Sequence, residues 1–191
     1  MSQLATSFFF QRSSRRTRGS RADRSRGKAI PDITLLINNA GATGGVKRED
    51  VRQNFLSVLP LVNNHFTGVS PDFYQLIDCR YYPVARGLMV PFEPPMIYGV
   101  GGQLFFPWFS FWRQNPLSNE RLSLFVTLVD EVLMQDPDLE RARFDVLDFS
   151  APNGTRELMV IDARNVPRLD EARKVQMLST FAEGSFKHKP S

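Results

Sequence analysis

Residues 143–164 carry the side chains whose types and spacing could do chemistry. The sequence predicts two strands there, joined by the turn-forming stretch APNGT. The stretch holds three carboxylates and two guanidinium groups: Asp145, Asp148, Asp162, Arg143 and Arg164. Carboxylates that face each other across paired strands repel unless a cation or ion pairs compensate. The stretch therefore encodes either a metal site or a set of Asp–Arg ion pairs.

The register of the two strands decides between these chemistries. A two-residue turn at Asn153-Gly154 would place Asp145 opposite Asp162. However, Pro152 has no N–H to donate across such a turn. A three-residue Pro-Asn-Gly loop suits the sequence better and shifts the pairing by one residue, so that Asp145 faces Ile161. We therefore expect the side chains of Asp145 and Asp162 to point to opposite faces of the sheet.

The order of elements around these carboxylates resembles the PD-(D/E)xK nucleases. A predicted helix bearing Glu131 precedes an acidic strand, a turn, a strand ending in acid-x-base and a final helix. In that family, paired carboxylates hold Mg²⁺ and a lysine orients the attacking water. The resemblance implies Asp145 or Asp148 as the first acid. Asp162 would stand at the position of the family's Glu, and Arg164 at that of its Lys, although no proline precedes the first acid and arginine keeps its proton.

No pair of a nucleophile and a base stands out elsewhere in the sequence. The two histidines lie in dissimilar places, His65 in a predicted loop and His188 in the basic C-terminal end. The single cysteine, Cys79, excludes an internal disulfide, and two histidines add too few ligands for a Cys/His zinc site. We expect a non-enzymatic binding protein without cofactor or metal. The alternative is a Mg²⁺-dependent nuclease of degenerate PD-(D/E)xK type.

The stretch PDITLLINNAGATGG at residues 31–45 suggests a third interpretation. Residues 35–41 resemble the Asn-Asn-Ala-Gly motif of the short-chain dehydrogenases, which would imply a nicotinamide cofactor. In that family a Gly-rich phosphate loop precedes the motif, and no Gly-rich turn between a strand and a helix precedes residue 35 here. The family's Tyr–Lys pair is matched by Tyr82 and Arg86, and arginine does not replace that lysine. The sequence favours a strand followed by an Asn/Gly turn.

The net charge of +4 conceals an asymmetry along the chain. Of 24 basic and 20 acidic side chains, residues 1–28 hold eight and one, which leaves 16 and 19 for the rest. Residues 1–30 lack an apolar period and are predicted to be a disordered tail. Its basic side chains are Arg12, Arg15, Arg16, Arg18, Arg21, Arg24, Arg26 and Lys28.

Three interpretations of this tail compete. It is a solvated tail without a partner, an arm that neutralises nucleic-acid phosphates, or a mitochondrial transit segment. The single cysteine and the absence of a recognisable secretory signal favour an intracellular protein. We expect the cytoplasm or nucleus, with the mitochondrial matrix as the compartment that the transit interpretation implies.

Residues 94–112, PPMIYGVGGQLFFPWFSFW, carry no charge. Gly101-Gly102 separates two β-rich runs and predicts a two-residue hairpin turn. Prolines and glycines interrupt the stretch and argue against a membrane span. Alternating aromatic residues cannot all face one core, so either helices cover both faces or a protein partner contacts the hairpin. The residues expected to meet a partner are Tyr98, Phe106, Trp108 and Trp112.

The periodicity of the whole chain predicts an α+β fold, with a largely antiparallel sheet flanked by two or three helices. We expect one domain over residues 31–186 and a basic end at 187–191. Besides the hairpin, strands are predicted at 33–37, 73–79, 84–92, 143–149 and 157–164. Helices are predicted at 47–59, 119–135 and 167–184. In the last helix the inward-facing residues are expected to be Ala172, Val175, Leu178, Phe181 and Ala182.

Overall fold

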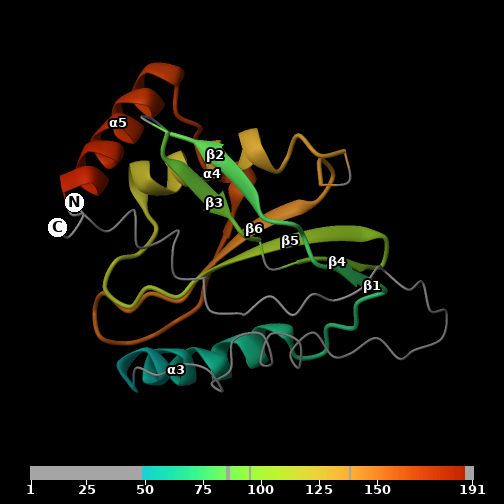
Figure 1. Ribbon diagram of the computed structural model, residues 1–191. Helices are drawn as coiled ribbons and strands as arrows, with labels where there is room; N and C mark the ends of the chain where they lie inside the picture. The colour runs from blue at the N-terminus through green and yellow to red at the C-terminus, as the bar shows by residue number, and fades with distance from the viewer. Residues whose placement is uncertain (1–48, 85–86, 95, 138, 188–191) are drawn as a thin grey trace.

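A computed structural model describes residues 49–84, 87–94, 96–137 and 139–187 (Figure 1). The basic tail, the predicted strand at 33–37, Arg86 and His188 lie outside the described residues, so the predictions made for them stay predictions. The described part combines helices with β-sheets, and the α+β class is confirmed.

The main sheet has five strands in the order β1-β4-β5-β6-β7, and a separate two-stranded sheet pairs β2 with β3. The strands are β1 (Phe73–Gln75), β2 (Arg80–Pro83), β3 (Met89–Phe92), β4 (Ile97–Val100), β5 (Gln103–Ser110), β6 (Arg143–Asp148) and β7 (Met159–Asp162). Every neighbouring pair is antiparallel except β5 and β6, which are parallel. A parallel pair needs a crossover, and the helix α4 (Asn119–Val132) supplies it.

Helices cover both faces of the main sheet (Figure 1). On one face, α4 and α5 (Glu171–Lys187) pack over a core that includes Phe92, Phe106, Phe125, Phe144 and Val146. On the other face, α3 (Glu49–Phe66) packs over a second core that includes Val58, Val62, Phe66, Leu147 and Phe149. The successive residues of β6 alternate between these two cores, as the pleat of a central strand requires.

Helix α3 is longer than the sequence predicts, because it continues through Pro60 to Phe66. Pro60 lacks the N–H that would donate to the preceding turn, which costs roughly 3 kcal/mol. Val62 and Phe66 lie one and two turns beyond Val58, and all three are buried. Burying each of these side chains contributes about 1.5–3 kcal/mol, which offsets the proline defect. The predictions that the helix ends at residue 59 and that His65 lies in a loop were wrong for this reason.

The hairpin predicted at Gly101-Gly102 is confirmed. Val100 pairs with Gln103, and the two glycines between them have φ of 56° and 80°. Two successive positive φ values are the signature of a type I′ turn, which glycine adopts without the steric cost of a Cβ. The turn fixes the β4–β5 register and so the alternation of the aromatic side chains that follow.

Helix α5 begins at Glu171, four residues after the predicted start. Asp170 caps it, because its Oδ1 accepts a hydrogen bond of 2.7 Å from the backbone N–H of Arg173. Its inward positions also differ from the prediction: Val175 is 50 % exposed, whereas Lys174 is buried with Leu178, Phe181 and Ala182. A polar network around Lys174, described below, replaces the expected apolar contact.

Candidate functional site

Strands β6 and β7 pair with Asp145 opposite Asp162, so the favoured register was wrong. The predicted turn does form: the N–H of Gly154 donates to the carbonyl of Ala151 at 3.1 Å, and Gly154 has a φ of 91°. However, residues 149–158 separate the two strands, and the turn is not continuous with either strand. Turn type sets register only in a tight hairpin. Here the register places Ile161 beside the buried Val146, where it packs against the core under α4 and α5.

The facing carboxylates are each held by an arginine of their own segment. The Nε of Arg143 lies 3.0 Å from Oδ1 of Asp145 and 2.9 Å from its Oδ2. The Nη2 of Arg164 lies 2.6 Å from Oδ2 of Asp162, and the backbone N–H of Arg164 donates to Oδ1 at 3.0 Å. Each pair spans two residues along the chain. The arrangement is the set of Asp–Arg ion pairs that the sequence offered as the alternative to a metal site.

The pKa values of the two aspartates are shifted in opposite directions. Burial raises the pKa of Asp145 above its usual range, although the hydrogen bond from Arg143 opposes the shift. Hydrogen bonds from Arg164 lower the pKa of Asp162 to about 2. Burial raises the pKa of Tyr98 to about 12, and the charge of Asp145 adds to the shift. Burial lowers the pKa of His65, at the end of α3, against the opposing charge of Asp145.

This arrangement disfavours a metal ion between the two aspartates. A cation between Asp145 and Asp162 would have to displace the two guanidinium groups from their oxygens. Among the described residues, no three His, Cys, Asp or Glu side chains gather in a way that could hold a metal ion. The facing carboxylates of Asp145 and Asp162 match the pattern of the nucleases, but no third acidic side chain of the described residues lies beside them to complete a metal site.

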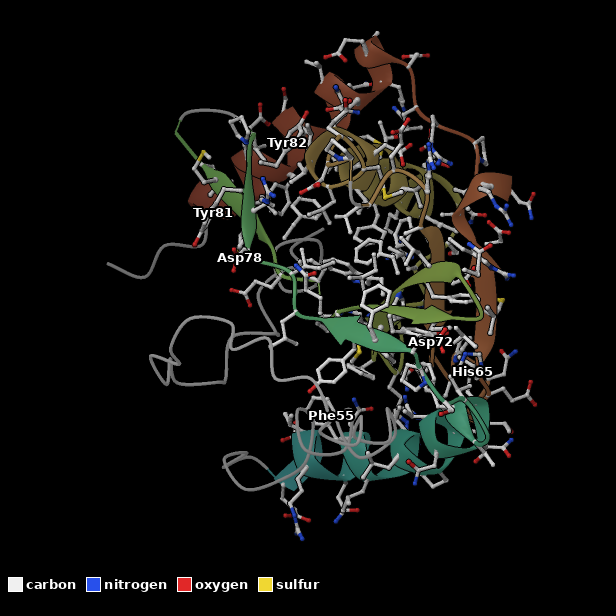
Figure 2. All side chains as sticks on the ribbon, turned by 90° about the vertical axis from the view of Figure 1, so that its right-hand side faces the viewer. Phe55, His65, Asp72, Asp78, Tyr81 and Tyr82 are labelled. Atoms are coloured by element: carbon white, nitrogen blue, oxygen red, sulfur yellow. The ribbon has the colours of Figure 1, made fainter. Side chains whose placement is uncertain are left out.

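The other residues that the nuclease resemblance implies lie elsewhere. Glu131, on α4, accepts hydrogen bonds from the hydroxyl of Tyr82 at 2.9 Å and from Nζ of Lys174 at 2.7 Å. Burial alone would lower the pKa of Lys174, but hydrogen bonds to Glu131 and Glu171 raise it above its ordinary value. Figure 2 shows Tyr82 beside α5 and His65 at the end of α3, on opposite sides of the sheet. Glu131 is therefore separated from Asp145.

Asp148 also points away from Asp145, because three residues of strand turn a side chain to the opposite face. It faces the side of the sheet that α4 and α5 cover and pairs with Ser110 of β5 and Met159 of β7. The structure thus brings together Asp145, Asp162 and Arg164, and leaves Glu131 and Asp148 outside that set.

The aromatic hairpin lies largely inside the protein. Phe106 is fully buried against Phe144, and Tyr98 stacks on Phe105 under α3. Neither side chain can contact a partner in this fold. Trp108 and Trp112 are half-buried, and Trp108 packs against Phe125 at the edge of the core. Two helical layers, one on each face, account for aromatic residues at alternating positions. In the part of the chain that the structure describes, no helix has the length and apolarity to cross a bilayer.

Tyr82, which the dehydrogenase interpretation singled out, donates to Glu131, and the rest of that motif lies outside the described residues. Sequence reasoning missed a second polar cluster, where β5 and β6 end with Ser110 and Asp148 side by side, followed by Arg113 and Arg156. Polar residues directly after a strand are the only signal for it. This signal identifies a cluster only when the two strands are known to be parallel neighbours.

Comparisons with known proteins give no family for this chain. No protein-family model matches the sequence, and no curated protein matches it.

Proposed function

We propose that this is a non-enzymatic binding protein whose basic arm, residues 12–28, contacts nucleic acid. The observation that carries the proposal is the charge distribution. The first 28 residues sum to +7, from eight basic side chains and one acidic, and the rest of the chain sums to −3, from 16 and 19. A chain that neutralises several phosphates releases their counterions, which supplies affinity without a shaped pocket.

The ion pairs of the folded domain support this division of roles. Several of its arginines are engaged by carboxylates of the same domain: Arg143 with Asp145, Arg164 with Asp162, Arg168 with Asp130, and Arg173 with Glu120. These guanidinium groups would have to give up a carboxylate before binding a phosphate. The arm, with one aspartate among eight basic residues, has little internal competition.

The test is a titration of fluorescent single-stranded and duplex oligonucleotides with the full-length chain and with a 29–191 truncation. We expect full-length affinity to fall by about three to five orders of magnitude between low and moderate salt, if most of the arm engages phosphates. A full-length variant with the eight basic residues of the arm changed to Gln controls for chain length. Equal affinity for the truncation, or affinity that salt leaves unchanged, would exclude the arm as the binding element.

The second part of the proposal is a protein partner at the aromatic hairpin. The half-buried Trp108 and Trp112 are the only tryptophans of the chain, so intrinsic fluorescence reports on this segment alone. A partner that covers them should shift the emission to shorter wavelength, since it removes water from the indole rings. An emission spectrum unchanged at saturating partner would place the interface elsewhere.

A Mg²⁺-dependent nuclease of PD-(D/E)xK type is the second candidate, because Asp145 faces Asp162 with Arg164 two residues beyond. A nuclease would cleave the oligonucleotide with Mg²⁺ and lose cleavage in Asp162→Asn. The exposed Asp78 provides the matched control, Asp78→Asn. Arg164→Lys should raise cleavage, because lysine orients the attacking water in that family. Cleavage that survives Asp162→Asn, or no cleavage by any variant, removes this candidate.

A further inference from the structure

The parallel strands β5 and β6 end side by side at Ser110 and Asp148. The chain segments that follow stay together: the N–H of Phe149 donates to the carbonyl of Ser110 at 2.9 Å, and the N–H of Ala151 donates to that of Arg113 at 2.7 Å. In Figure 1 these segments leave the sheet together, near the N-terminal end of α3. In sheets with parallel strands, ligands bind in the crevice outside the carboxyl ends of those strands.

A buried carboxylate at this edge has an oxygen without a close hydrogen bond in the described part of the chain. Asp148 is 1 % exposed, and its Oδ2 accepts a hydrogen bond of 2.9 Å from the hydroxyl of Ser150. Its Oδ1 has no close hydrogen-bond partner within the described part of the chain, although the hydroxyl of Ser110, which is 6 % exposed, lies near enough to lower the pKa of Asp148. Most buried polar atoms in folded proteins have such a partner. Together the two groups offer a hydrogen-bond acceptor and a hydroxyl to a ligand.

Arg156 lies near Asp148, and Arg113 lies near Arg156. The guanidinium of Arg156 donates to the carbonyl of Phe149 and to the side-chain oxygen of Asn54 on α3, which fixes its position at the edge. Arg113 follows β5 and is exposed. Within the described residues, neither guanidinium lies at ion-pair distance from a carboxylate. Burial and the charge of Arg113 both lower the pKa of Arg156, so an anion between the two arginines would be stabilised.

We propose that the carboxyl edge of β5 and β6 binds a small sugar phosphate, with the phosphate between Arg113 and Arg156 and a hydroxyl on Asp148 and Ser110. The two arginines and the Asp148–Ser110 pair together indicate a ligand that carries both a phosphate and a hydroxyl. Two guanidinium groups match the charge of a phosphate dianion better than that of a single carboxylate, and each can donate two parallel hydrogen bonds to it. A carboxylate repels phosphate but accepts from a hydroxyl, so Asp148 requires a donor beside the anion.

Calorimetric titration of the full-length chain with ribose 5-phosphate tests the proposal, with inorganic phosphate and ribose as the two part-ligands. We expect ribose 5-phosphate to bind more tightly than either part. Arg113→Gln should lower the affinity for ribose 5-phosphate by about tenfold or more, because a charge-assisted hydrogen bond is lost. Arg141→Gln removes the same charge at another exposed position and should leave affinity unchanged, which also controls for phosphate bound by the basic arm.

Asp148→Asn separates the two halves of the site. It should weaken the binding of ribose 5-phosphate, because the hydroxyl contact is lost, and it should leave the binding of inorganic phosphate unchanged or slightly tighter, because a carboxylate that repels phosphate is removed. Circular dichroism of each variant confirms that it is folded. The proposal is overturned if ribose 5-phosphate shows no binding at millimolar concentration. It is also overturned if Arg113→Gln and Arg141→Gln weaken binding equally, or if inorganic phosphate binds as tightly as the sugar phosphate.

Discussion

Asp145 and Asp148 lie three residues apart on β6, and burial raises the pKa of both, yet their surroundings differ. Both oxygens of Asp145 lie near Arg143, and its neighbour Asp162 is held in the same way by Arg164. Asp148 accepts from the hydroxyl of Ser150 on one oxygen and has no close hydrogen bond on the other within the described residues, while the nearby Arg156 binds a carbonyl and an amide instead.

The difference shows how sequence distance affects electrostatic pairing. An arginine two residues away on the same strand projects from the same face, so Arg143 reaches Asp145 whatever the topology of the sheet. Asp148 has no basic residue at that spacing, since Ser150 occupies it. Its electrostatic environment comes from β5 and from the segment that returns with Arg156. The paired site is therefore local, and the unpaired site depends on the fold.

The largest effect is expected for Arg156→Ala. The variant leaves the carbonyl of Phe149 and the amide oxygen of Asn54 without their donor, and it removes a positive charge near the buried Asp148. We expect a loss of about 2–3 kcal/mol in the free energy of unfolding, measured by urea denaturation. Arg113→Ala, at an exposed neighbouring position, should stay within about 0.5 kcal/mol. Equal losses would show that Arg156 is not a structural link between α3 and the edge.

The second effect should be larger at Asp148 than at Asp145. Burial raises the pKa of Asp148 above the unfolded value of about 3.9, so folding takes up a proton between the two values and stability falls as pH rises through that range. Asp148→Asn removes this dependence of stability on pH. At pH values above that range the variant should raise the free energy of unfolding by about 1 kcal/mol.

Asp145→Asn provides the comparison. Burial raises the pKa of Asp145 as well, so neutralising it should also favour folding, but the variant leaves Arg143 without a charged partner, and the net change at neutral pH should stay within about 0.5 kcal/mol. Urea denaturation at acidic and neutral pH measures both variants. If Asp145→Asn stabilises as much as Asp148→Asn at neutral pH, the distinction between the paired and the unpaired aspartate is wrong.

The smallest effect is expected for Asp162→Asn. The partner guanidinium of Arg164 is largely exposed, so the pair contributes less than about 1 kcal/mol. Because the folded pKa of about 2 lies below the unfolded value, this contribution is present above about pH 3.9 and is lost as pH falls through about 2. In the variant, the free energy of unfolding should depend less on pH between about 2 and 3.9, and its pH dependence elsewhere should not change. High salt should reduce the difference from wild type, and a difference that salt leaves unchanged would contradict an exposed ion pair.

Local patterns in the sequence predicted several elements well. Two adjacent glycines between β-rich runs gave the β4–β5 hairpin, because only a short turn with positive φ joins such strands. The apolar period of α4 gave a helix that begins at the predicted residue, Asn119. The predicted Pro-Asn-Gly turn formed as well, closed between Ala151 and Gly154. Each of these depends on neighbours within a few residues, which the sequence states directly.

The β6–β7 register could not be predicted from the same turn. That inference assumed that the strands reach the loop, whereas β6 ends at Asp148 and β7 begins at Met159. The packing of the half-buried Ile161 beside the buried Val146 sets the pairing instead, and this contact exists only after α4 and α5 cover that face. The facing of Asp145 and Asp162 is therefore a consequence of core packing.

By itself, the sequence determined the α+β class, the charge separation between arm and domain, and the arginine partners two residues from Asp145 and Asp162. Only the tertiary structure decided that β5 and β6 are parallel, which residues meet at their carboxyl edge, and which aromatic side chains are buried. The physical reason is the range of the interactions. Backbone propensity, charge content and pairing between close neighbours act over a few residues, whereas strand order and burial depend on side chains far apart in the chain that only packing brings together.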